Sequence, residues 1–137
     1  MYFETHTVIS DKQGRITLPR MLLKSGVIVR GGSICLVPME GDYWMACEPE
    51  RILRIIEAEF PGSVLDPDVR DMRREFMIRV KSLHVDPQGR VSIPFGDGSN
   101  DGLEFMVIGT GWEFEIWPMA VWRATFKEAG GKDEQSE

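Results

Sequence analysis

The sequence D-K-Q-G-R-I-T-L-P at residues 11–19 returns as D-P-Q-G-R-V-S-I-P at residues 86–94. Five of the nine positions are identical, and three others exchange Ile for Val, Thr for Ser and Leu for Ile. A match of this kind inside a chain of 137 residues indicates one supersecondary unit that was built twice. Two copies of about seventy residues each would bury too little surface to be stable alone, so we expect them to share one core.

Each copy of the motif begins with residues that favour a tight turn. Residues 5–10 are rich in β-branched side chains and predict a strand. Asp11 and Gly14 fit the first and fourth positions of a type I turn, with the glycine in the left-handed region as in a G1 bulge. Asp86 and Gly89 occupy the same positions in the second copy. The sequence therefore predicts a β-hairpin around each turn.

The strand that follows the first turn has two chemically different faces. Ile16 and Leu18 lie on one face, and Arg15 and Thr17 lie on the other. Pro19 cannot donate a hydrogen bond to a neighbouring strand and should end the pairing. A turn explains the shared aspartate and glycine, but it gives no reason for the shared arginine and glutamine. We expect the arginines to be held outward at the turn tips, where each can pair with the aspartate four residues before it.

The rest of each copy continues the same order of elements. The glycine-rich residues 96–102 replace the short helix of the first copy, so we do not expect the second copy to keep it. The predicted elements are a helical turn over 20–25 closed by Gly26, hairpins over 34–47 and 105–117, and helices that open at Pro49, Pro67 and Pro118. We expect an α+β fold in which both hairpin units form one barrel-like β core with helices packed outside. The predicted units are residues 1–60 and 61–129, followed by a disordered acidic tail at 130–137.

The charge of the chain is unevenly distributed. A formal net charge of −6 argues against a protein that coats nucleic acid through its overall charge. Residues 10–30 nevertheless contain a single acid and five basic residues, namely Lys12, Arg15, Arg20, Lys24 and Arg30. No apolar run reaches the length of a membrane span and the polar start is no signal peptide, so we expect a cytoplasmic protein.

The chain as a whole resembles the MraZ family, whose fold is a tandem form of the AbrB-like swapped-hairpin domain. The resemblance rests on Asp11-x-x-x-Arg15 and Asp86-x-x-x-Arg90 with their G-R-[IV]-x-[LI]-P continuations, and on the ending F-E-I-W-P-M-A-V-W at residues 114–122. It extends over about residues 3–128. It implies that the two units of the α+β fold are AbrB-like, MraZ-type hairpin units.

The resemblance implies a sequence-specific, DNA-binding transcription regulator of the division and cell-wall gene cluster. It further implies a ring-shaped homo-oligomer that binds repeated promoter boxes on double-stranded DNA at the nucleoid. The motif arginines can read guanine in the major groove, and the other basic residues can contact phosphates. The expected DNA-binding residues are Lys12, Arg15, Arg20, Lys24 and Arg90, supported in the turns by Asp11, Gly14, Asp86 and Gly89. Pro87 stands where the first turn has Lys12, so the two turns do not present the same donors.

Two other classes of function are open to such a sequence. Swapped-hairpin domains also occur as antitoxin halves that bind a partner protein, and four tryptophans could form that interface: Trp44, Trp112, Trp117 and Trp122. The polar tail of about ten residues is short for a toxin-binding segment. An enzyme is the third class, but no nucleophile–base pair or metal-ligand spacing is visible. We therefore expect no enzyme activity, metal, cofactor or small-molecule substrate, and we read Cys35 and Cys47 as reduced core residues.

Overall fold

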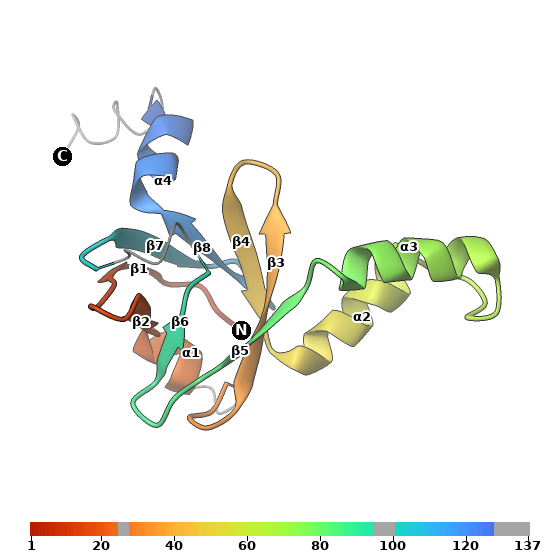
Figure 1. Ribbon diagram of the computed structural model, residues 1–137, viewed down its shortest axis with the longest axis horizontal. Coiled ribbons are helices and arrows are strands. Elements are labelled where there is room, and N and C mark those ends of the chain that lie inside the picture. The colour runs from red at the N-terminus through yellow and green to blue at the C-terminus, as the bar shows by residue number, and fades with distance from the viewer. Residues whose placement is uncertain (25–27, 95–100, 128–137) are drawn as a thin grey trace.

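The computed structural model describes residues 1–24, 28–94 and 101–127 (Figure 1). The first copy of the repeated unit consists of β1 (Thr5–Ile9), β2 (Arg15–Thr17), α1 (Arg20–Lys24), β3 (Ser33–Met39), β4 (Tyr43–Cys47) and α2 (Pro49–Glu59). The second consists of α3 (Pro67–Met77), β5 (Lys81–His84), β6 (Arg90–Ser92), β7 (Glu104–Gly109), β8 (Phe114–Pro118) and α4 (Met119–Thr125). The predicted α+β class is confirmed, and the predicted strands and helix starts are found within a few residues.

The strands of the two copies alternate within one antiparallel sheet. Its order is β1-β7-β8-β4-β3-β5, and β2 pairs with β6 in a separate two-stranded ribbon. Strands β1 to β4 of the first copy correspond in order to β5 to β8 of the second. When the sheet is read from its other end and each strand is replaced by its counterpart, the same order results, so the copies are related by a pseudo-twofold axis. In the ribbon, Ile16 pairs with Val91, its own counterpart in the repeat. Within the described residues the strand pairs form no closed barrel, so the barrel-like core is not confirmed.

The predicted hairpin around each turn is wrong beyond the turn itself. The N–H of Asp11 donates to the carbonyl oxygen of Arg15 at 2.9 Å, and the two strands then part. β1 continues along β7, and β2 continues along β6. The reason is burial: pairing with the other copy places Ile16 against Val91, and both side chains are buried in the main core.

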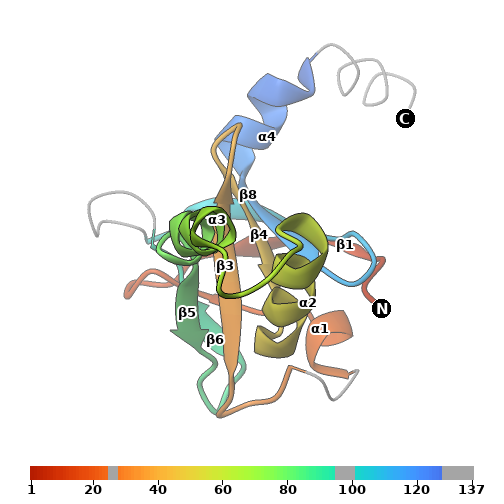
Figure 2. The same cartoon turned by 90° about the vertical axis from the view of Figure 1, so that its right-hand side faces the viewer.

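The alternation of side chains along β3 separates two hydrophobic clusters. Ile34 and Leu36 belong to the main core between the sheet and the ribbon. Cys35 and Val37 point to the opposite face, where α2 and α3 lie (Figure 2). The predicted helical period places the buried Ile52 and Ile56 and the partly buried Phe76 over that face. The expectation that helices pack outside the β core holds for α2 and α3.

Cys35 and Cys47 lie directly opposite each other on β3 and β4. Both are buried free cysteines, as expected for reduced core residues. Burial raises the pKa of Cys35, and burial together with the neighbouring Cys35 raises the pKa of Cys47 to about 12. Both groups are therefore neutral thiols at physiological pH, and they serve as small apolar side chains.

Several predictions lie outside the described residues. These are the end of α1 at Gly26, the loss of a short helix at residues 96–100 and the acidic tail at residues 130–137. The division into units of residues 1–60 and 61–129 stays a prediction.

Candidate nucleic-acid interface

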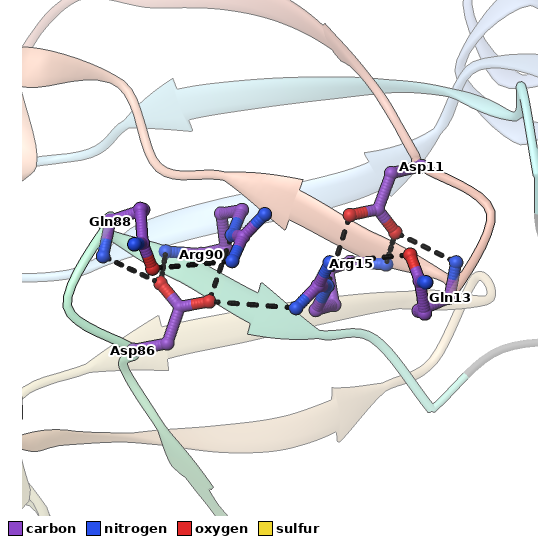
Figure 3. A network of polar contacts seen from close by, with 6 residues as sticks. All are labelled: Asp11, Gln13, Arg15, Asp86, Gln88 and Arg90. Carbon is purple, nitrogen blue, oxygen red and sulfur yellow. Dashed lines mark hydrogen bonds and ion pairs between the residues drawn. The ribbon is translucent and has the colours of Figure 1, made fainter.

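The first turn is held by a network of side-chain hydrogen bonds (Figure 3). Asp11 Oδ1 accepts from the backbone N–H groups of Gln13 and Arg15, each at 2.9 Å. Asp11 Oδ2 accepts from Arg15 Nε at 3.0 Å, and the Arg15 guanidinium also donates to Gln13 Oε1 at 3.2 Å. The predicted pair between the aspartate and the arginine four residues later is confirmed.

The second turn repeats every one of these bonds. Asp86 Oδ1 accepts from the N–H groups of Gln88 at 2.9 Å and Arg90 at 2.8 Å. Asp86 Oδ2 accepts from Arg90 Nε at 2.8 Å, and Arg90 donates to Gln88 Oε1 at 3.2 Å. The glycines of the turns, Gly14 and Gly89, have φ values of 77° and 80°, which favour glycine. The network thus gives the shared glutamine and arginine a role that the turn type alone did not reveal.

The carboxylates of both turns are stabilised as anions. At Asp11 the hydrogen bond from the Arg15 backbone is the largest influence, and it lowers the pKa against the opposing effect of burial. At Asp86 burial is the largest influence and raises the pKa, but hydrogen bonds from Arg90 and Gln88 and the charge of Arg90 together lower it. Both aspartates are therefore ionised at neutral pH and hold their arginines by charge-assisted hydrogen bonds.

The β2–β6 ribbon brings the two motif arginines onto one face. Arg15 lies opposite Ser92 and Arg90 lies opposite Thr17, while the residues between them point into the core. Arg15 Nη1 lies 3.9 Å from Asp86 Oδ2, so the networks of the two turns meet across the ribbon (Figure 3). The Arg15 and Arg90 side chains are 28 % and 30 % exposed.

The two motif guanidinium groups are therefore held in ion pairs beside their turns. Each arginine is the first residue of the strand that follows its turn, and an aspartate neutralises it. The six residues of Figure 3 carry two positive and two negative charges, so this cluster has no net charge. The physical reason is that a half-buried guanidinium is stable only beside an anion or other good acceptors.

The remaining predicted basic residues are exposed but separated. Lys12 lies at the tip of the first turn. Arg20 and Lys24 lie on α1, which follows the first motif in the chain but packs beside the second turn: a Cβ placed on Gly89 would lie 2.8 Å from Leu23 Cδ1. The basic stretch of the first copy is thus divided between both turns. Neither the period of the strands nor the motif could predict this division.

The tryptophans are mostly used in packing. Trp117 is buried and stacks on Tyr43 with ring centroids 3.9 Å apart, and Trp122 and Phe126 pack against it. Trp112 is 57 % exposed. Because the Trp117 cluster is engaged in packing within the chain, this arrangement does not favour the antitoxin-type alternative.

Comparison with known proteins finds relatives whose sequences match most of the chain. It is 32 % identical to the transcriptional regulator MraZ of Kineococcus radiotolerans over 93 % of its own length and 88 % of that protein. It is 34 % identical to MraZ of Arthrobacter sp. strain FB24, covering 93 % of this chain and 89 % of that one. The chain belongs to the MraZ family. No family model matches it.

Membership of the MraZ family is consistent with the geometry of the duplicated motif. Thermobifida fusca provides a further MraZ relative, 33 % identical over 89 % of this chain and 84 % of its own. In the described part of this MraZ-family chain no helix is long and apolar enough to cross a membrane, and no group of three or more His, Cys, Asp or Glu side chains could hold a metal ion. The β2–β6 ribbon with its two arginines is the candidate contact surface.

Proposed function

We propose that this protein is a sequence-specific, DNA-binding transcriptional regulator that contacts the duplex with the outer face of the β2–β6 ribbon. One observation carries the proposal: the swap between copies places Arg15 and Arg90 on the same exposed face of a two-stranded ribbon. A two-stranded ribbon fits the major groove, and arginine binds guanine there through two parallel hydrogen bonds.

The pairing of each arginine with an aspartate is compatible with base recognition. A guanidinium has five N–H donors, and the turn network uses Nε and one donor of the terminal NH2 group. The two terminal nitrogens retain donors that can bind a base edge. Because Asp11 and Gln13 already fix the orientation of Arg15, little side-chain entropy is lost when a base binds.

The acidic total charge suits an assembly better than a single binding unit. One neutral cluster on a subunit of charge −6 would bind a duplex weakly. Several ribbons on a ring-shaped homo-oligomer, each meeting one of a set of repeated promoter boxes, would bind more tightly through effective concentration. The ring-shaped assembly is part of the proposal. So are its target, the division and cell-wall gene cluster, and its place of action, the nucleoid in the cytoplasm.

Fluorescence anisotropy with a promoter fragment that carries repeated boxes, taken from upstream of the protein's own gene, tests the function. Arg15→Ala should weaken binding by about 1–3 kcal/mol and relax the sequence preference if Arg15 reads a base. Arg51→Ala is the matched control, because Arg51 is equally exposed and pairs with Glu113 at 2.6 Å, yet it lies on α2 and not on the ribbon. It should leave DNA binding unchanged.

Thermal unfolding of all three proteins separates lost contact from lost fold. Equal affinities of the wild type and a folded Arg15→Ala variant would remove Arg15 from the contact surface. Failure of the wild type to bind any fragment from its own promoter region would overturn the proposed function.

A further inference from the structure

An arginine that the motif does not contain lies beside the second turn. The Nε and Nη2 atoms of Arg30 lie 3.7 and 4.0 Å from the position that a Cβ on Gly89 would take. The neighbouring backbone fixes this placement, since the Gly31 N–H donates to the carbonyl oxygen of Val85 at 2.8 Å. Val85 directly precedes Asp86, so Arg30 is tied to the start of the second turn although it belongs to the first copy.

The state of this arginine differs from that of the two motif arginines. Arg30 is exposed, and no carboxylate in the part of the chain that the structure describes forms an ion pair with it. Arg15 and Arg90 are held by aspartates. Among the described residues nothing neutralises the guanidinium of Arg30, which leaves its donors and its charge for an external anion.

The first turn has an acid in the equivalent place. The Gly102 N–H donates to the carbonyl oxygen of Ser10 at 2.9 Å, as Gly31 does to Val85, and both glycines have a positive φ. Asp101 is thus the pseudo-twofold counterpart of Arg30, and it too is exposed. The two turns consequently carry opposite charges at matching positions.

The tips of the two turns also differ in charge, and here the cation is on the first turn. The first has Lys12 where the second has Pro87. Each turn therefore has one cation beyond its Asp–Arg pair, but that of the first turn is accompanied by Asp101 and that of the second is not. Helix α1 adds two more cations near the second turn, because its five residues span only about 7.5 Å.

We propose that Arg30 binds the DNA phosphate backbone beside the second turn and takes there the place that Lys12 has at the first. The inference rests on the proposed DNA-binding function. An exposed guanidinium at the edge of a ribbon that enters the major groove lies where the phosphates that flank the groove would pass. It also makes the second turn the more strongly phosphate-binding of the two.

The test is the salt dependence of binding to the promoter fragment, measured by fluorescence anisotropy over a range of KCl concentrations. Each phosphate contact contributes about 0.9 to the slope of log K against log salt concentration. Arg30→Gln should reduce the magnitude of that slope by about this amount without changing which boxes are preferred. Arg54→Gln removes an exposed arginine from α2, with the same change in total charge, and should leave the slope unchanged.

A second variant tests the geometry in the opposite direction. Asp101→Arg puts a cation at the matching place of the first turn and should increase the magnitude of the slope. The control is Glu57→Arg, which makes the same charge change on an exposed position of α2.

The outcomes separate this inference from the function beneath it. An unchanged slope for a folded Arg30→Gln variant, while the wild type binds and Arg15→Ala weakens binding, overturns the role of Arg30 alone. An unchanged slope for Asp101→Arg overturns the argument from equivalent positions. A wild type that binds no promoter DNA overturns the proposed function itself.

Discussion

Gly89 meets two demands at one position. Its φ of 80° is a conformation that side chains with a Cβ rarely adopt, and a Cβ there would also lie 2.8 Å from Leu23 Cδ1 on α1. Gly102 has a similar φ of 74°, but nothing lies within 4 Å of its added Cβ. The two glycines therefore separate backbone strain from close packing.

We predict that Gly89→Ala lowers the free energy of unfolding by more than Gly102→Ala does. The second variant should show only the cost of a left-handed alanine, about 1–2 kcal/mol. The first should add the displacement of Leu23. Urea unfolding followed by circular dichroism measures both, and equal effects would show that Leu23 moves aside at no measurable cost.

Helix α2 shows how an amphipathic element joins the β core. Its residues Ile52 and Ile56 lie on the cluster formed with Cys35 and Val37, while Leu53, which lies between them in the sequence, is 61 % exposed. Pro49 begins the helix, as proline suits the first helical position. Helix α3 is capped by Asp66, which accepts a hydrogen bond from the Asp68 N–H at 2.9 Å.

Truncation of a buried and of an exposed residue of α2 should have very different effects on stability. Ile56→Ala should lower the free energy of unfolding by about 2 kcal/mol or more, because a buried isoleucine leaves a cavity. Leu53→Ala, its matched control one turn away, should stay within about 0.5 kcal/mol of the wild type. Thermal and urea unfolding provide the comparison, and a large effect of Leu53→Ala would show that this face is covered in solution.

The molecule as a whole depends on strand pairs between the copies. β1 pairs with β7, β4 with β8, β3 with β5, and β2 with β6, so each of these contacts joins the two halves of the chain. Among the strands of the described residues, pairing within a half is limited to the β3–β4 and β7–β8 hairpins. A single hairpin is marginally stable in water.

Residues 1–60 and residues 61–129, produced separately, should therefore show no cooperative unfolding transition. An equimolar mixture should recover the far-ultraviolet circular dichroism and the cooperative melt of the intact chain, because the missing partners are then supplied in trans. A sharp melting transition of either half alone would contradict the shared core.

The local elements followed from the sequence because their causes are local. Asp11 and Gly14 specify the turn through nearby backbone groups, and Pro49 and the Asp66–Pro67 pair specify where helices open. The alternation around Ile16 predicts which side is buried. The hairpins beyond the turns were predicted wrongly, because the same apolar stripe can pair within a copy or between copies.

The sequence by itself determined the two turns, the strand faces and the Asp–Arg pairs, since each depends on residues within four positions of one another. Only the tertiary structure decided that β2 pairs with β6, that both arginines share one face and that Arg30 lies beside Gly89. Those placements arise when the two copies bury their apolar stripes against each other. That burial joins residues far apart in the chain, and no short-range pattern records it.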